Sequence, residues 1–503
     1  MTRQPPREIE LKLALPPGEA AAFLARMARR RTQPVCQTLH TRYFDTPDFD
    51  LSRAGVALRV RRAGRRWVQT LKTEGERLGG LSQRTEYEMP VARGEPDWPR
   101  FPDEALAHVP ASLRARLVPV FETRFARTAW LLAGRGGAQI EVALDRGEVR
   151  AGPRRAPLCE LELELKHGQP DALFELARTW AAAFGCVPND ESKAARGVRL
   201  AHGGAPAPVR SGALALDPGQ SMEDAFGAIC RDALAHFQAN LPGVLASDDI
   251  EFVHQARVAL RRLRAILRVS RRACVPPPAL LDGLRVIAAA LGPTRDWDVL
   301  CGETWPAIMQ HFDDVPACAA ETARLQAHQT AVRDAMRAAL TQARPGVWLL
   351  DMARWLLARG WRDAPEPQRR LQRSPLAGWA RDTLRRGHRA VLRDIRRFDA
   401  LTPVERHALR IRIKRLRYAL EFFLALYPGR NHARLLAALR SAQDTLGQAN
   451  DAHVAAHLLK SLPKPAASAR AFALGWLAAR SVATDTGENA KALKNIVKLR
   501  VDW

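Results

Sequence analysis

The 503-residue chain is longer than a single domain of roughly 100 to 200 residues, so we expect two or three folded units. Hydrophobic residues make up 47% of the chain and charged residues 26%, a composition that excludes wholesale disorder. Lys and Arg outnumber Asp and Glu by 78 to 53, and the resulting net charge of +25 favours an anionic partner. Nucleic acid, phosphorylated small molecules, polyphosphate and acidic membranes are the candidate classes.

Cysteine usage and the N-terminal sequence both favour a cytoplasmic protein. The seven cysteines are far apart, odd in number and never form C-x-x-C, so we expect neither a zinc site nor a disulfide framework. The first residues lack the apolar segment of a signal peptide, and no run of 18 apolar residues exists to span a bilayer. We therefore expect no membrane partner.

A Gly-, Pro- and Ala-rich stretch from His202 to Gln220 divides the chain. It predicts an N-terminal domain over residues 1–201, a linker over 202–216 and a C-terminal domain over 217–503. Residues 1–200 hold 33 basic and 25 acidic side chains, a net +8, which leaves +17 for the remainder. The C-terminal domain is thus the more basic of the two.

The first domain alternates polar and apolar residues with the period of a β-strand. Five segments show this pattern clearly: 8–12, 58–61, 68–72, 84–88 and 159–166. Gly- and Pro-containing breaks separate them, and a helical period covers residues 18–31, 103–117 and 171–184. These patterns predict an α+β domain.

After the linker the hydrophobic period changes to 3.6, which predicts an all-α domain. Long helices are expected over residues 221–241, 250–270, 317–343 and 403–426. Two motifs recur in the same order at nearly the same offset: His254-x-x-Arg257-x-x-x-Arg261 returns as His407-x-x-Arg410-x-x-x-Lys414, and Leu291-Gly292 returns as Leu446-Gly447. The repetition predicts two duplicated helical bundles.

The predicted strands place their charges on one face. In a strand Glu8, Glu10 and Lys12 point to the same side, and similar one-sided charge recurs at 59/61, 84/86/88 and 160/162/164. Stacked carboxylates repel one another unless cations share them, so the pattern favours a polar, metal-binding interior over a solvated face. Carboxylates without His or Cys favour Mg²⁺ or Mn²⁺, and interleaved Arg and Lys favour an oligophosphate ligand.

These residues resemble the ExExK signature of the CYTH superfamily, the triphosphate tunnel metalloenzymes. The resemblance continues in order through Tyr43-Phe44-Asp45-Thr46, Leu58-Arg59-Val60-Arg61, Thr70-Leu71-Lys72, Leu144-Asp145-Arg146-Gly147, Glu160-Leu161-Glu162-Leu163-Glu164 and Ser192-Lys193-Ala194-Ala195-Arg196-Gly197. It implies a closed antiparallel eight-stranded barrel with flanking helices, whose interior is a tunnel that holds a triphosphate.

The resemblance also implies roles for individual residues. The implied metal ligands are Glu8, Glu10, Asp145, Glu160, Glu162 and Glu164. The implied triphosphate-binding residues are Lys12, Arg59, Arg61, Lys72, Lys193, and Arg124 or Arg127. The two arginines have opposite parity, so only one can face inward from a regular strand, and we favour Arg127.

The repeated motifs of the second domain resemble the CHAD domain, which is found attached to CYTH domains. Their basic residues step by three and four, which places them on one helical stripe in each repeat. The resemblance implies binding of inorganic polyphosphate by His254, Arg257, Arg261, Arg264, His407, Arg410, Lys414 and Arg417.

The fusion favours a metal-dependent inorganic triphosphatase that also binds polyphosphate. Two alternatives remain open: a non-catalytic polyphosphate-binding or targeting protein, and a tunnel enzyme for an organic triphosphate such as thiamine triphosphate or ATP. Aromatic residues are only 6% of the chain and do not interleave with the basic stripes, so nucleic acid is not favoured. In the cytoplasm, polyphosphate granules are one structure with which such a protein could associate.

Overall fold

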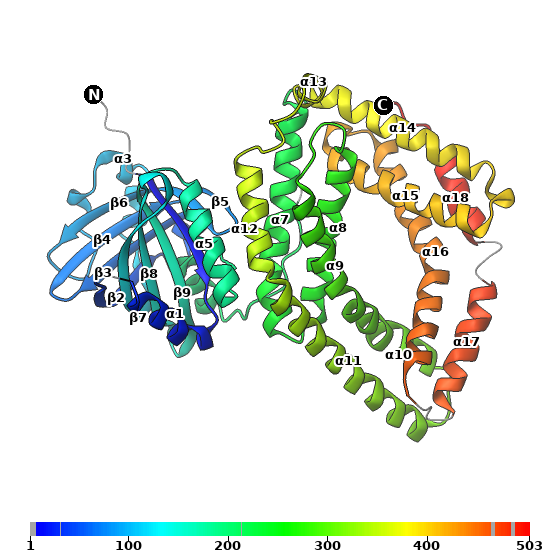
Figure 1. Cartoon of the computed structure of the whole chain (residues 1–503), viewed down its shortest axis with the longest axis horizontal. Helices are drawn as coiled ribbons and strands as arrows, with labels where there is room; N and C mark the ends of the chain where they lie inside the picture. The colour runs from blue at the N-terminus through cyan, green and yellow to red at the C-terminus, as the bar shows by residue number, and fades with distance from the viewer. Residues whose placement is uncertain (1–6, 31, 213, 464–467, 484–487) are drawn as a thin grey trace. The chain divides into compact units, whose positions relative to one another are not determined.

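The computed structural model describes residues 7–30, 32–212, 214–463, 468–483 and 488–503. The chain divides into two compact units (Figure 1). The first comprises Met1–Pro208 together with Arg344–Ala358, and the second comprises Val209–Ala343 together with Arg359–Trp503. The segment Arg344–Ala358 comes from the middle of the predicted C-terminal domain. The position of the linker in the sequence did not predict that this segment would belong to the first unit.

The first unit is built around a closed antiparallel barrel. The eight barrel strands run in the spatial order β1-β9-β8-β7-β2-β3-β4-β6, and β6 pairs with β1 to close the ring. Their bounds are β1 Arg7–Ala14, β2 Val35–Asp45, β3 Val56–Ala63, β4 Arg66–Thr73, β6 Leu81–Val91, β7 Val118–Ala133, β8 Gln139–Ala151 and β9 Arg154–His167. Two short strands, β5 Glu76–Leu78 and β10 Val187–Pro188, extend the sheet beside β6 and β1. The predicted α+β class and eight-stranded barrel are confirmed.

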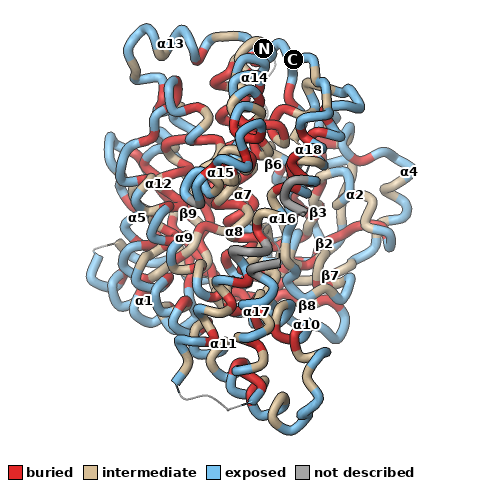
Figure 2. The backbone as a smooth tube through the Cα atoms, turned by 90° about the vertical axis from the view of Figure 1, so that its right-hand side faces the viewer, coloured by how far each residue is buried: buried red, intermediate tan, exposed pale blue. Residues whose placement is uncertain are grey.

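Apolar residues of the strands face out of the barrel, where helices cover them. On β1, Leu11 and Leu13 are fully buried, and α5 (Asp171–Phe184) packs against this strand. A second apolar cluster, which includes Leu58 and Tyr87, lies under the segment that carries α3 (Asp103–Leu106) and α4 (Ala111–Arg114). Because these two hydrophobic cores lie outside the barrel, much of its interior is free to carry charge, although smaller apolar clusters around Phe121 and Phe125 share the inner face. Figure 2 shows the buried and exposed segments along the chain.

The remaining helices of the first unit are α1 Ala20–Ala28, α2 Asp50–Arg53, α6 Lys193–Ala201 and α12 Pro345–Leu357. The single helix predicted over 103–117 is wrong: Pro110 precedes α4 and separates it from α3, because the residue before a proline disfavours helical backbone. The helix predicted over 171–184 matches α5 in both bounds.

Helix α12 completes the first unit by packing against α5 and β10. Arg344 and Arg359, which flank this helix, both have left-handed backbone, with φ of 48° and 49°. The guanidinium of Arg354 pairs with Asp171, and Arg178 donates to Asp351 at 2.8 Å, so ion pairs join α12 to α5. The chain thus turns sharply at both ends of a docked helix.

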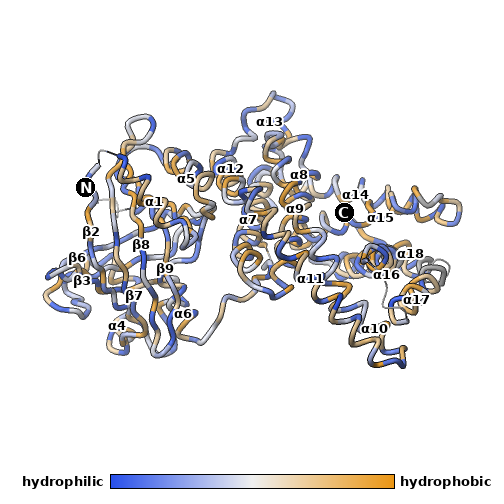
Figure 3. Tube along the Cα trace, turned by 60° about the horizontal axis from the view of Figure 1, so that its bottom comes forward, coloured by the Kyte–Doolittle hydropathy of each residue, from blue (hydrophilic) through white to orange (hydrophobic). Residues whose placement is uncertain are grey.

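The second unit is all-helical. Its helices are α7 Met222–Ala246, α8 Ile250–Val269, α9 Pro278–Val299, α10 Trp305–Met309, α11 Val315–Ala343, α13 Glu366–Gln372, α14 Leu376–Ile395, α15 Pro403–Phe423, α16 Arg430–Ser461, α17 Ala469–Ala483 and α18 Glu488–Lys498. Consecutive long helices pack on one another: α7 on α8, α8 on α9 and α9 on α11, then α14 on α15, α15 on α16, and α16 on α17 and α18. Apolar and polar residues alternate along these helices in Figure 3, as expected of amphipathic helices.

The repeated motifs occupy equivalent helices of the second unit. The His254 motif lies on α8 and the His407 motif on α15, while Leu291-Gly292 lies on α9 and Leu446-Gly447 on α16. Helix α8 contacts α15, and α9 contacts α16, so corresponding helices of the two repeats meet.

All seven cysteines carry free thiols. Within the part of the chain that the structure describes, no helix is both long and apolar enough to cross a bilayer.

The contact of α12 with the Gly79–Gly80 turn gives a first prediction. Both Gly79 and Gly64 have left-handed backbone, but a Cβ on Gly79 would lie 2.3 Å from Cβ of Ala353 on α12, whereas a Cβ on Gly64 would meet nothing within 4 Å. Both alanine substitutions should cost about 1 kcal/mol of backbone strain. We expect Gly79→Ala to lower the midpoint temperature of the first unfolding transition seen when the full chain is heated, and to lower it more than Gly64→Ala does. Equal transition temperatures would show that α12 is not docked against this turn.

Candidate functional site

The barrel encloses a highly charged cavity of about 870 Å³. Eleven Lys and Arg side chains and eight Glu side chains line it, an excess of three positive charges. Ten of the residues predicted for the tunnel line this cavity: Glu8, Glu10, Lys12, Arg59, Arg61, Lys72, Arg127, Glu162, Glu164 and Lys193. Asp145, Glu160 and Arg124 do not.

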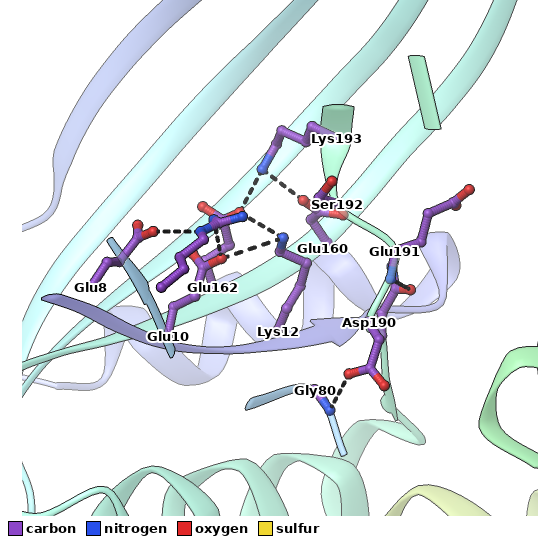
Figure 4. Close-up of polar contacts among 12 residues, drawn as sticks. Glu8, Glu10, Lys12, Gly80, Glu160, Glu162, Asp190, Glu191, Ser192 and Lys193 are labelled. Carbon is purple, nitrogen blue, oxygen red and sulfur yellow. Dashed lines mark hydrogen bonds and ion pairs between the residues drawn. The ribbon is translucent and has the colours of Figure 1, made fainter. Parts of the chain in front are cut away.

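Strands β1 and β9 bring the two predicted carboxylate motifs together. Glu10 lies opposite Glu164 in the antiparallel register, and Lys12 lies opposite Glu162. Figure 4 shows Glu8, Glu10 and Lys12 beside Glu160 and Glu162. Cross-strand neighbours on one face are about 5 Å apart, so the register places acidic and basic groups within direct reach.

The backbone of Lys12 is held by two segments that are distant in sequence. Its N–H donates to the carbonyl of Gly80 at 2.9 Å, and its carbonyl accepts from the N–H of Asn189 at 3.0 Å. The N–H of Gly80 in turn donates to Asp190 at 2.8 Å (Figure 4). These hydrogen bonds hold the backbone near the C-terminal end of β1 in place.

Lys193 enters the barrel from the first turn of α6. The side chain of Ser192 caps this helix by accepting from the N–H of Ala195, and the helix packs against β7 and β8. Gly197 permits the close packing, because a Cβ there would lie 2.1 Å from the ring of Phe121. The ammonium of Lys193 lies 2.6 Å from Glu160, 2.7 Å from Asp145 and 2.8 Å from Glu162.

Asp145, Glu160 and Glu162 could also hold a metal ion, since one oxygen from each lies within 4.8 Å of the others. In the structure this cluster is already neutralised by Lys193 and by Arg127, which donates to both Asp145 and Glu162. Burial would raise the pKa of Glu162, but Lys193, Arg127 and Lys12 outweigh it and hold that pKa well below its ordinary value. Glu162 is therefore ionised.

The structure resolves the choice between the two arginines of β7 in geometric terms. Arg127 pairs with the buried Asp145, and its side chain is 16% exposed. Arg124 is 49% exposed and pairs with Glu122 outside the barrel. Residues three apart on a regular strand face opposite sides, so Arg124 does not belong to the tunnel set.

Glu164 lies among carboxylates rather than cations. It is opposite Glu10 on β1 and opposite Glu141 on β8, and its ion pair is with Lys166, 39% exposed, two residues along the same strand. Burial raises the pKa of Glu164, and the charges of Glu8 and Glu141 add to the rise. A cation would relieve this repulsion, and the all-oxygen donor set suits a hard divalent ion.

The arginines of β3 form a contrasting, cation-rich part of the cavity. Burial and the nearby charges of Arg59 and Arg127 lower the pKa of Arg61 to about 10. Arg61 donates to the hydroxyl of Thr41 at 3.4 Å, and Arg59 lies 3.4 Å from Glu86. Lys72 is better compensated, since its ammonium lies 2.7 Å from Glu8 and 3.1 Å from Glu86. An anion would relieve the repulsion around Arg61.

Nine further charged residues line the cavity beyond those predicted: Arg7, Glu74, Arg77, Arg84, Glu86, Glu88, Glu141, Lys166 and Arg199. Arg84 donates to Glu8 at 2.9 Å and to Glu10 at 2.6 Å, so it ties the acidic motif of β1 to β6. Strand parity could have identified Glu141, because it lies four residues before Asp145 on the same face of β8.

In the second unit the two predicted basic stripes converge. The pKa of Lys414 is lowered to about 8 by burial and by the charges of Arg261, Arg410, Arg417 and Arg257. Two of these arginines belong to α8 and two to α15. The stripes therefore share one electrostatic environment.

The remaining predicted residues of the stripes differ in exposure. Arg264 and His407 are exposed, and His254 is half-buried. Burial lowers the pKa of His254, and Arg295 lowers it further, so this imidazole is neutral at pH 7. Arg417 pairs with Glu421 at 2.7 Å, which makes it the one stripe residue with a carboxylate partner among the contacts of the described residues.

Comparison with known families agrees with both halves of this geometry. The CYTH domain model matches residues 6–198, and the CHAD domain model matches residues 228–460. The chain carries a CYTH domain and a CHAD domain. The crystal structure of the CHAD domain from the plant Ricinus communis is 33% identical, with a TM-score of 0.52, and the match covers 58% of this chain and 98% of that one.

Curated relatives match parts of the chain. An inorganic triphosphatase of Haemophilus influenzae is 35% identical over 202 residues, which cover 39% of this chain and 55% of the relative. An uncharacterised protein of Mycobacterium tuberculosis is 30% identical over 292 residues, which cover 54% of this chain and 53% of the relative. The matched regions thus span about half the length of these relatives.

The pairing of Arg127 gives a stability prediction with a matched control. Arg127→Ala removes a partner from the buried Asp145 and from Glu162, whereas Arg124→Ala removes an exposed ion pair. We expect Arg127→Ala to lower the free energy of unfolding by about 3 kcal/mol and Arg124→Ala by less than about 1 kcal/mol. Urea denaturation followed by circular dichroism measures both. Equal losses would contradict the assignment of Arg127 to the interior.

Proposed function

We propose that the CYTH domain hydrolyses inorganic triphosphate with the help of a divalent cation. The observation that carries this proposal is the division of charge in the cavity. Arg61 lies near Arg59 and Arg127 and has no ion pair within 4.0 Å among the described contacts. Glu164 lies opposite Glu10 and Glu141, and its ion pair is with Lys166, which is 39% exposed. A fully ionised triphosphate carries more negative charge than the excess of three positive side chains can balance, so a divalent cation would restore neutrality. Phosphoryl transfer needs this kind of positioning and charge neutralisation.

In this proposal, cations along several strands and α6 bind the phosphate chain. The group comprises Lys12, Arg59, Arg61, Lys72, Arg127 and Lys193, all of which line the cavity. Arg61 gains most from an anion, because burial and two neighbouring arginines disfavour its charge in the free protein. Arg127 and Lys193 are already paired with Asp145, Glu160 and Glu162, and these ion pairs would orient both cations toward a phosphate.

The carboxylates Glu8, Glu10, Glu141 and Glu164 would hold the cation. Glu164 is central, because Glu10 and Glu141 are its cross-strand neighbours. A bound Mg²⁺ or Mn²⁺ would neutralise phosphate charge and lower the pKa of a bound water. Asp145 and Glu160 have a positioning role, because they are buried and anchor Lys193.

Inorganic triphosphate is favoured over organic triphosphates because 19 of the 30 residues that line the cavity are charged and aromatic side chains are scarce among them. Tyr43 is the one aromatic side chain among the described residues that line it, and it stacks on Phe121 at 4.5 Å between ring centroids. The relative from Haemophilus influenzae bears the name inorganic triphosphatase and matches this part of the chain. Phosphate release from triphosphate, ATP, thiamine triphosphate and long-chain polyphosphate, with and without metal, tests the substrate and separates catalysis from binding alone.

A glutamine substitution at Glu164 tests the proposed cation site. Glu164→Gln removes one carboxylate from the set, and loss of such a contact typically weakens metal binding by about 10- to 100-fold. We expect the Mg²⁺ concentration for half-maximal triphosphate hydrolysis to rise by that factor. Glu122→Gln is the control, because Glu122 pairs with His40 and Arg124 outside the barrel. An unchanged metal requirement in Glu164→Gln would remove Glu164 from the metal site.

We also propose that the CHAD domain binds inorganic polyphosphate through the two basic stripes. The support is that residues of both helices act on the same group: besides burial, the charges of Arg257 and Arg261 of α8 and of Arg410 and Arg417 of α15 lower the pKa of Lys414. A long polyanion could neutralise both stripes at once and gain from release of its counterions. Cytoplasmic polyphosphate granules are the setting that this binding would suit.

The titration of Lys414 gives a pH prediction. Its pKa is about 8 in the free protein, and a bound polyanion would raise it, so binding takes up a proton above pH 8. Polyphosphate affinity should therefore fall about tenfold between about pH 7 and about pH 9, measured with metal chelated. Lys414→Arg keeps its charge throughout this range, so its affinity should change much less. The same pH dependence in both proteins would place Lys414 outside the binding surface.

A further inference from the structure

The CHAD domain contains a second large cavity, of about 750 Å³, whose composition differs from that of the tunnel. It lies among α8, α14 and α15, with Leu371 of α13 at its edge. Its volume falls within the range of roughly 300 to 1,000 Å³ that is usual for small-molecule sites.

One part of the cavity is strongly cationic. Eight basic side chains line it: Arg261, Arg264, Arg268, Arg271, Arg272, Arg386, Lys414 and Arg415. No ion pair joins any of them to a carboxylate of the described residues within 4.0 Å, and Asp382 is the one acid in the lining. Burial lowers the pKa of Arg264, and the charges of Arg268 and Arg285 lower it further. These groups offer a ready site for several phosphates.

The lining of the same cavity also contains apolar and aromatic side chains. These are Ala265, Val269, Leu371, Trp379, Ile411 and Tyr418. Trp379 is half-buried, and its ring stands at 87° to that of Phe423 with centroids 5.6 Å apart. This edge contact occupies at most one face of the indole. The guanidinium of Arg417 lies 4.1 Å from the centre of the Tyr418 ring, so Trp379 is the better stacking surface.

Uncharged and acidic polar groups in the lining suit an organic ligand better than a chain of phosphates. The hydroxyl of Ser270 is buried and has no hydrogen-bond partner among the described residues, although Ser270 lines the cavity. Asp382, beside Thr383 on α14, offers a carboxylate that accepts hydrogen bonds and repels phosphate. Such groups match the hydroxyls of a ribose and the amino group of a base.

We propose that this cavity binds a nucleoside oligophosphate. Its phosphates lie against the arginines of α8 and α15, its base stacks on Trp379, and Ser270, Asp382 and Thr383 contact its sugar or base. Inorganic polyphosphate uses the cationic part alone, so it leaves the aromatic wall and the buried hydroxyl without partners. This inference goes beyond the proposed hydrolysis of triphosphate, which takes place in the other domain.

Photoaffinity labelling of the full chain with 8-azidoadenosine triphosphate locates the ligand. Metal is chelated during labelling, so that hydrolysis in the CYTH domain is suppressed. We expect peptides that contain Trp379 or Tyr418 to be labelled, and unlabelled ATP to compete better at these peptides than inorganic triphosphate does. Label confined to residues 1–208 would overturn the proposal, because it would assign nucleotide binding to the tunnel.

Two substitutions test the contacts by calorimetric titration of the same chelated protein. Trp379→Ala should weaken ATP binding to this site about tenfold while leaving inorganic triphosphate nearly unchanged, since stacking acts on the base alone. Trp476→Ala is the control, because Trp476 lies in another cluster of the same domain. Asp382→Asn, at a side chain 56% exposed, should strengthen inorganic triphosphate binding and lower the preference for ATP.

The affinity ratio of ATP to inorganic triphosphate decides the outcome. If Trp379→Ala and Asp382→Asn both keep the wild-type ratio, the cavity recognises phosphate alone and the nucleoside assignment is wrong. If Trp379→Ala fails to fold, the exposed Asp382→Asn variant and the labelled peptides still give the answer. Failure here would leave metal-dependent triphosphate hydrolysis untouched, because that activity is measured separately in the presence of metal.

Discussion

The burial of like charges inside the barrel is the constraint on which the rest of the CYTH domain depends. Strand alternation sends apolar residues such as Leu11 outward to the helices and sends charged residues inward, where little water remains to stabilise them. Most inward charges are therefore paired, as Lys193 is with Glu160 and Asp145. Arg61 and Glu164 are left poorly compensated, each among its own sign. This residual imbalance is what a phosphate chain and a cation together would remove.

The basic stripes of the CHAD domain have little acidic compensation: among the described contacts, Arg417 is the one stripe residue with a carboxylate partner, Glu421. These stripes belong to two helices whose apolar faces pack in the domain. Because this packing fixes the helices, Lys414 stays close enough to Arg261 and Arg410 for their charges to lower its pKa. Repulsion of this kind lowers the stability of the free protein and is relieved when an anion binds. Under the proposed functions, the tunnel would bind ligands of both signs, whereas the helical domain would bind an anion alone. The two units would then differ in chemistry even though both would bind phosphates.

Local sequence patterns predicted five of the eight barrel strands, because a period of two assigns each residue to a face. The closed barrel and the roles of individual tunnel residues were implied by the family resemblance. The same rule predicts that Arg124 and Arg127 face opposite sides, but only pairing with Asp145 shows which one is inside. Two features lay beyond this reasoning. Asp145 and Glu160 pair with Lys193 because α6 directs the side chain of Lys193 into the barrel. These ion pairs join segments that are distant in sequence, so no local pattern predicts them. Helix α12 has the same period as its neighbours in sequence, so its docking on α5 leaves no local signal.

The docking of α12 extends the folded unit that contains the CYTH domain beyond the segment that precedes the linker. The helix is continuous with the CHAD domain at both ends, yet it touches the turn at Gly79, and the next residue, Gly80, accepts a hydrogen bond from the backbone of Lys12. A chain cut after the linker would therefore lose the partner of α5 and β10 as well as the support of this turn. Lys12, the last residue of the Glu8–Lys12 motif, is thus bonded to a turn that a segment far downstream in the sequence contacts. Domain boundaries drawn from the linker alone do not describe the unit that positions Lys12.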